Sequence, residues 1–84
     1  MPYIKESQRK VFRPLLSDLP YMRNKGELEY CIFFLMQRYM DEKPRKYTHL
    51  HDVVYAAQHC ADEFRRRFLD EREDQAREEN GDVD

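Results

Sequence analysis

The sequence predicts an all-α fold: a small three-helix domain with an N-terminal arm and a long C-terminal helix, expected to be oligomeric. Apolar residues between Leu50 and Phe68 recur at steps of three and four, the period of a helix with one buried face. Residues 25–42 are also rich in apolar side chains and lie between a polar cap and a proline. No segment alternates polar and apolar residues as a half-buried strand would.

Residues 1–12 are predicted to form the arm, which begins extended and contains a short helical turn over residues 6–12. The first full helix is predicted over residues 13–23, with Pro14 in its first turn, where a missing N–H costs no hydrogen bond. Pro20 would end or bend this helix. The side chains that we expect this helix to bury are Leu15, Leu16 and Leu19.

The second helix is predicted over residues 25–42. Asn24 and Glu27 have the spacing of a capping box, and Pro44 prevents the helix from continuing. One face carries six apolar residues, yet three aromatic residues, Tyr30, Phe33 and Phe34, fall on the other side. A helix that is apolar nearly all round is buried nearly all round. Two helices of the same chain or a second subunit could cover it, and the sequence favours neither.

The third helix is predicted over residues 48–80, with Thr48 as its N-cap and Gly81 as its stop. Residues 81–84 then form a short tail. The apolar stripe of the third helix ends near Phe68, so this helix is expected to project beyond its own core. Together the arm, the three helices and the tail make residues 1–84 a single helical domain.

The size and the charge of the chain favour a homo-oligomer. With 84 residues, 40% of them hydrophobic and 38% charged, a monomer would be marginally stable. The net charge of −2 is uneven: residues 1–69 carry 13 basic and 9 acidic side chains, and residues 70–84 carry 2 and 8. The acidic end fits either a solvated helix terminus or a charged contact with a neighbour.

Catalytic, cofactor and metal sites are not expected. Two distant glycines cannot build a phosphate-binding loop, and neither serine lies in a nucleophile motif. The spacing of His49, His51 and His59 does not suit a single metal ion. Cys31 and Cys60 lie in helical apolar patterns, without a leader sequence or a membrane-length apolar run, which favours reduced thiols in the cytoplasm.

A candidate ligand site lies on the back of the third helix. His51, Tyr55, His59 and Arg66 share one face, and such a face can stack on a ring and neutralise a phosphate. The arm is basic and aromatic, so both could line one pocket. The candidate ligand-binding residues are Tyr3, Lys5, Arg9, Tyr55, His59 and Arg66. Alternatively, Tyr55 and His59 pack against the arm. The weak basic field argues against general nucleic-acid binding.

Four short motifs carry a resemblance to a known family over nearly the whole chain. They are Met1-Pro2-Tyr3-Ile4-Lys5, Gly26-Glu27-Leu28-x-Tyr30, Glu63-Phe64-x-Arg66-Arg67 and Glu79-Asn80-Gly81-Asp82-Val83. The sequence resembles a family of short, uncharacterised phage and prophage proteins, classed as a domain of unknown function. It departs from that family at Arg65, often tyrosine, and at Asp84, commonly aromatic. The resemblance implies a phage accessory protein in the bacterial cytoplasm and supplies no activity.

The functional hypothesis is a non-enzymatic phage protein that binds and sequesters a host factor, counteracting host defence. A small anionic nucleotide signal is the favoured factor. One alternative is a protein–protein inhibitor of a host nuclease or defence complex, acting through its acidic C-terminal helix. Another is a small DNA-binding regulator. The residues expected to contact a subunit or a partner are Tyr30, Phe33, Phe34, Asn80, Gly81, Asp82 and Val83.

Overall fold

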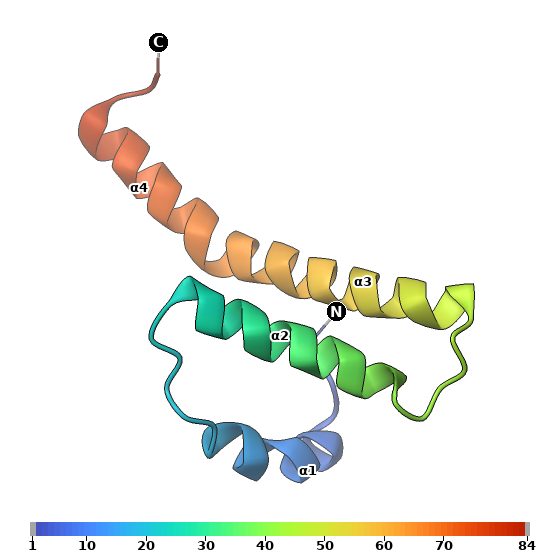
Figure 1. Cartoon of the computed structure of the whole chain (residues 1–84). Helices are drawn as coiled ribbons and strands as arrows, with labels where there is room; N and C mark the ends of the chain where they lie inside the picture. Colours follow the sequence, from blue (N-terminus) through green and yellow to red (C-terminus); the bar gives the residue numbers. More distant parts are fainter. Residues whose placement is uncertain (1, 84) are drawn as a thin grey trace.

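The computed structural model describes residues 2–83 and confirms the all-α fold (Figure 1). No strand occurs within that range. The helical elements are α1 (Glu6–Ser17), α2 (Lys25–Met40), α3 (Tyr47–Phe64), the π-helical segment η1 (Arg65–Leu69) and α4 (Asp70–Asn80).

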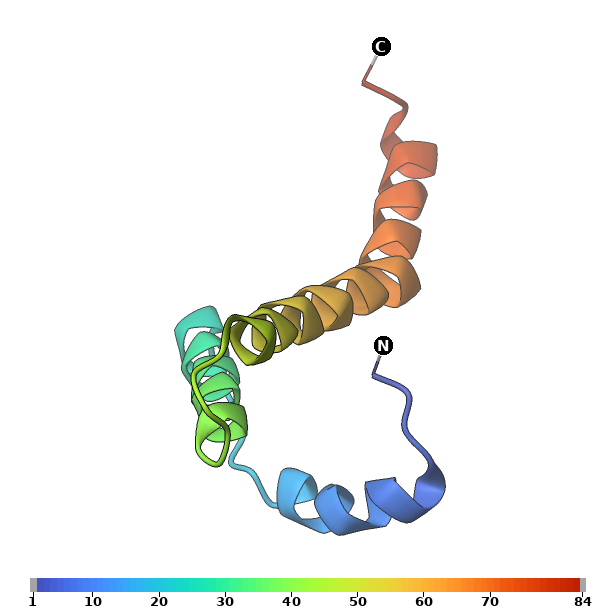
Figure 2. The same ribbon diagram turned by 90° about the vertical axis from the view of Figure 1, so that its right-hand side faces the viewer.

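Helices α2 and α3 run antiparallel and lie side by side, as both views show (Figures 1 and 2). Half-buried Cys31 and Met36 belong to α2, and half-buried Val53 and Ala57 belong to α3. Helix α2 begins at the predicted residue and ends two residues early. Its cap differs slightly from a capping box, because the side chain of Glu27 accepts the N–H of Arg23 at 2.7 Å.

The predicted helix over residues 13–23 is wrong in its bounds, because α1 spans Glu6–Ser17 and holds Pro14 in its interior. The backbone N–H groups of Gln8 and Arg9 donate to the carbonyl of Lys5 at 2.9 and 3.0 Å, which starts the helix at the arm. A proline inside a helix removes one hydrogen bond, and here the helix continues for only one more turn.

Helix α1 packs against no other helix of the described residues: none of its Cα atoms lies within 8 Å of another helix. Figure 2 shows it standing apart from the α2–α3 pair, while the arm returns toward α3. The expected burial of Leu15, Leu16 and Leu19 is therefore wrong for the single chain, and Leu15 is 70% exposed. Leu15 and Leu16 lack a core because α1 has no neighbouring helix, and Leu19 lies beyond the end of α1.

The predicted helix over residues 48–80 is present as α3, η1 and α4 in series, starting one residue earlier. Lys46 is its N-cap and offers no side-chain bond, so the expected capping by Thr48 is wrong. The N–H of Asp70 donates to the carbonyl of Arg65, the five-residue step of a π-helix, and the helix bends there (Figure 1). Gly81 ends α4 as predicted, with φ +85°.

The single chain is unusually open. Among residues 2–83 no side chain is fully buried. Its radius of gyration is 16.7 Å, whereas a compact chain of this length would have about 12 Å. Its accessible surface of 8142 Å² exceeds by about 2,700 Å² the area of a compact protein of the same mass. The fold thus leaves much apolar surface without intramolecular cover.

Candidate functional site

Four rings form a row along one side of α3: Tyr47, His51, Tyr55 and His59. Each residue lies four positions after the last, so neighbouring side chains meet on the helix surface. The successive ring centroids are 4.0, 5.4 and 6.4 Å apart. We call these four residues the aromatic row. The last pair is stacked, with 19° between the planes of Tyr55 and His59.

The next position in this series is Glu63, which joins α3 to the arm. The Tyr3 hydroxyl donates to Glu63 Oε1 at 2.5 Å, and the guanidinium of Arg66 donates to both carboxylate oxygens. Arg67 Nε lies 3.8 Å from the same Oε1, and its guanidinium lies 5.9 Å from the centre of the Tyr3 ring. We call Tyr3, Glu63, Arg66 and Arg67 the Glu63 cluster. It links two segments sixty residues apart in sequence.

The charge of the Glu63 cluster is well defined. The Glu63 side chain is 14% exposed. Hydrogen bonds, first from Arg66 and then from Tyr3, hold the pKa of Glu63 below its ordinary value, because they favour the ionised carboxylate. With Glu63 ionised and two guanidiniums beside it, the cluster keeps one net positive charge.

The six predicted ligand residues fall into separate groups. Tyr3 and Arg66 meet at Glu63, and Tyr55 stacks with His59, as the shared-face prediction requires. The arm meets α3 through the bond from Tyr3 to Glu63, four residues beyond His59, and packing of Tyr55 and His59 on the arm stays a prediction.

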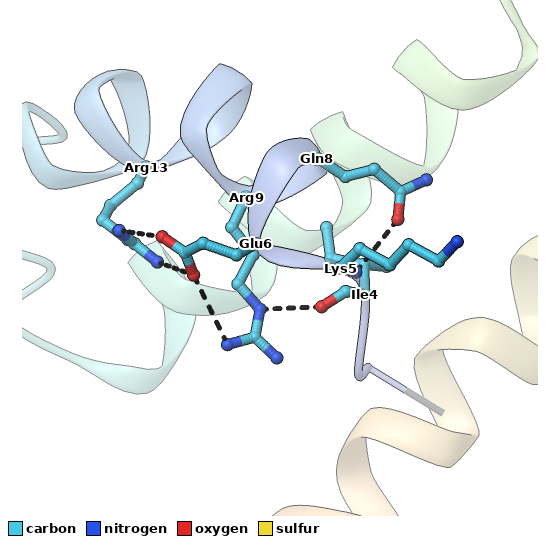
Figure 3. Close-up of polar contacts among 6 residues, drawn as sticks. All are labelled: Ile4, Lys5, Glu6, Gln8, Arg9 and Arg13. Atoms are coloured by element: carbon cyan, nitrogen blue, oxygen red, sulfur yellow. Dashed lines mark hydrogen bonds and ion pairs between the residues drawn. The ribbon is translucent and has the colours of Figure 1, made fainter.

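Lys5 and Arg9 lie at the start of α1 (Figure 3). Arg9 Nε donates to the carbonyl of Ile4 at 2.8 Å, and the N–H of Lys5 donates to Gln8 Oε1 at 3.0 Å. Figure 3 shows the two side chains pointing in different directions. Arg9 is one wall of a shallow hollow on α1, so it belongs to that helix rather than to the aromatic row.

The carboxylate of Glu6 pairs with two basic side chains of α1. Arg13 donates to both of its carboxylate oxygens, at 2.9 and 3.0 Å, and Arg9 Nη1 lies 3.8 Å away (Figure 3). Both guanidiniums are thus paired within the helix. An anionic ligand would compete with Glu6 here and with Glu63 in the Glu63 cluster, and each group keeps one net positive charge. The Glu63 cluster is the better candidate for recognition of a ringed anion because it continues the aromatic row on the same helix.

The residues predicted to contact a subunit or a partner are exposed. On α2, Tyr30 is 71%, Phe33 60% and Phe34 55% exposed. At the C-terminus the contacts are local: Asn80 donates to the carbonyl of Ala76, Gly81 N–H donates to Arg77, and Asp82 accepts the N–H of Val83. A role of this terminal segment in an interface therefore stays a prediction.

Sequence reasoning missed two residues of the site, Tyr47 and Glu63. The step of four residues between His51, Tyr55 and His59 extends to both of them and could have found each as a neighbour on the helix. The bond from Glu63 to Tyr3 has no signal in the sequence pattern, because it joins positions sixty residues apart.

Within residues 2–83 no group of three or more His, Cys, Asp or Glu side chains is arranged to hold a metal ion. Cys31 and Cys60 are free thiols. None of the helices in that range has the length and apolar character needed to cross a membrane.

A family model described as a domain of unknown function (DUF6899) matches residues 1–83. The chain therefore belongs to this family. No curated protein and no solved structure matches the chain.

Proposed function

We propose that this member of the DUF6899 family is a non-enzymatic phage accessory protein that sequesters a small anionic nucleotide of its bacterial host, acting against host defence. The observation that carries the proposal is the continuity of the aromatic row with the Glu63 cluster along one helix. Flat rings and guanidiniums are the two kinds of group that bind a base and a phosphate.

The spacing of these groups suits a nucleotide better than a bare anion. Arg66 lies seven positions after His59, about 10 Å along a helix. A ligand that contacts both residues needs a planar ring and a phosphate at about this separation. In a nucleotide the ribose lies between the two and provides that spacing. Tyr55 is 50% exposed, so part of its ring is accessible for stacking.

The net charge of the Glu63 cluster supports an anionic ligand. Arg66 and Arg67 outnumber the one carboxylate by a single positive charge. Glu63 also accepts hydrogen bonds, so it can receive a hydroxyl or a base N–H beside the phosphate. The bond from Tyr3 to Glu63 holds the arm at this cluster, where the Tyr3 side chain adds a further aromatic ring.

The proposal is tested by thermal-shift screening of the purified protein against cyclic and linear nucleotides. We expect at least one to raise the melting temperature and to be recovered chemically unchanged. The Tyr55→Ala variant should weaken its binding about tenfold or more, the range measured for loss of one stacked base. Tyr21→Ala is the matched control, because Tyr21 is an exposed tyrosine outside the helices.

Failure of all nucleotides to stabilise the protein, together with co-purification of a host protein, would refute the nucleotide proposal. Recovery of a converted nucleotide would refute the non-enzymatic part alone. Equal affinity of Tyr55→Ala and the unmodified chain would remove the aromatic row from the site.

A second candidate is a protein–protein inhibitor of a host nuclease or defence complex, and the placement of α4 favours it. This helix projects beyond the α2–α3 pair and carries three acids in its first turn, all exposed (Figure 1). Deleting residues 70–84 separates the two candidates. A nucleotide site on α3 keeps its affinity after the deletion, whereas an inhibitor that acts through α4 loses its activity.

A further inference from the structure

We propose that two copies of the chain associate by exchange, with α1 of each copy lying on the outer face of α2 of the other. The two surfaces are the apolar face of α1 and the face of α2 turned away from α3. The residues of the first are Val11, Phe12, Leu15 and Leu16, and those of the second are Tyr30, Phe33 and Phe34.

The first surface is a well-defined helix face. At about 100° per residue, Val11, Leu15, Phe12 and Leu16 fall within about 140° of one another, with Ser17 and Lys10 on the opposite side. All four apolar side chains are more than half exposed. No helix among residues 2–83 lies near α1, so this face has no helical cover, and only Pro2 and Ile4 of the arm line a hollow with Phe12 and Leu16.

The second surface is wide enough for a helix of another chain to pack on it. Tyr30, Phe33 and Phe34 fall within about 100° on the side of α2 opposite Ile32 and Tyr39. The outer three residues are also more exposed than these two. Aromatic side chains of this size contribute strongly to protein interfaces, where they cluster in the desolvated centre.

The two surfaces are held apart within one chain. Tyr3 anchors the arm before α1 to Glu63, and the Asn24 cap fixes the start of α2 after it, with the N–H of Glu27 donating to Asn24 Oδ1 at 2.8 Å. Helix α1 is therefore tethered at both ends. Laying α1 on its own α2 would pull the arm away from Glu63, whereas a second copy can approach without disturbing that contact.

The excess accessible surface of the single chain is compatible with the association of two identical chains. The excess of about 2,700 Å² per chain over a compact protein includes the projecting α4, so about 5,400 Å² is an upper bound on the area that two chains can bury, and obligate homodimers bury about 2,000–5,000 Å² or more. Each chain offers one α1 face and one α2 face, so a two-fold axis satisfies both at once and closes the assembly. A dimer of this kind needs no ligand and stands whether or not nucleotides bind.

Crosslinking between chains tests the exchange. In a background with Cys31→Ser and Cys60→Ser, Leu15→Cys is placed in one chain and Phe33→Cys in a second chain with a different tag. The two chains are co-expressed, purified through both tags and treated with a short bis-maleimide. We expect a crosslinked product of two chains, and at least a tenfold lower yield when Ser17→Cys replaces Leu15→Cys, because Ser17 lies on the opposite face of α1.

A single chain carrying both Leu15→Cys and Phe33→Cys is the complementary measurement. Crosslinking within that chain, at the size of one chain, would overturn the exchange by showing that α1 folds onto its own α2. Failure to isolate chains carrying both tags would also overturn it, as would equal yields from the Leu15→Cys and Ser17→Cys pairs.

Discussion

Helices α1 and α4 are the two ends of the helical chain, and within residues 2–83 neither packs against another helix beyond its own continuation. Their exposure is similar, but their chemistry is opposite. One face of α1 is made of large apolar side chains, whereas Ala76 is the only aliphatic residue of α4. The comparison teaches that exposure alone does not reveal an interface. An interface is indicated instead by the free-energy cost of leaving the exposed side chains in water.

For α1 the cost is large, because each large aliphatic or aromatic side chain left in water forgoes about 1.5–3 kcal/mol of burial. For α4 it is small. Acidic residues in the first turn interact favourably with the helix dipole, and Arg77 lies 3.8 Å from Asp74. Such exposed pairs contribute only a few tenths of a kcal/mol. We therefore assign self-association to α1 and leave α4 to solvent or to a partner of opposite charge.

The largest expected effect comes from a charge on the apolar face of α1. Leu15→Asp should raise the dissociation constant of the dimer at least a hundredfold, because it places an unpaired carboxylate in an apolar contact. Ser17→Asp, on the opposite side, is the control and should leave the constant unchanged. Dilution series followed by light scattering measure both. An unchanged mass for Leu15→Asp would place the interface elsewhere.

Removing α4 should have a much smaller effect. A chain ending at Leu69 loses 15 residues that cover no apolar face, so we expect the same oligomer and a melting temperature within a few degrees of the full chain. Calorimetry and light scattering on the truncated chain check this. Dissociation on truncation would show that α4 is part of the interface and would erase the difference between the two ends.

The fold and the site differed in how far the sequence could predict them. Helix α2 was predictable because its cap, apolar content and terminating proline all agree. The bounds of α1 were not, because Pro14 is typical of a first turn and here lies inside the helix. The four-residue spacing of Tyr55 and His59 was enough to predict that they are neighbours on the helix surface. The contact of Tyr3 with Glu63 depends on tertiary structure and has no local signature.

A finer prediction concerns the tether that holds α1 away from α2. Tyr3→Phe removes one hydrogen bond to Glu63, so the pKa of Glu63 should rise partway toward its ordinary value, while Arg66 keeps it depressed. In the unmodified chain, ionised Glu63 stabilises the fold above the ordinary carboxyl pKa. This contribution is lost as the pH falls through the lowered pKa.

The pKa of Glu63 is measured by NMR titration of its side-chain carboxyl carbon in both proteins. The loss of stability on acidification should also be smaller in Tyr3→Phe. An identical titration of Glu63 in both proteins would mean that the arm does not hold this carboxylate in solution.

The smallest expected effect lies at the end of α4. Gly81 has φ +85°, a conformation that side chains rarely adopt, so Gly81→Ala strains the helix stop. Because α4 supports no other helix, the change should increase hydrogen exchange only near residues 77–81 and leave the melting temperature unaltered. Loss of global stability would contradict the independence of α4.

The mass of the unmodified protein in solution tests the central claim most directly. Light scattering should give about twice the chain mass of 10.4 kDa, and the mass should fall toward a single chain only on extensive dilution, together with loss of helical circular dichroism. A stable, helical species of one chain mass at about 100 µM, a concentration at which even a Kd of about 10 µM would leave most chains paired, would contradict the account.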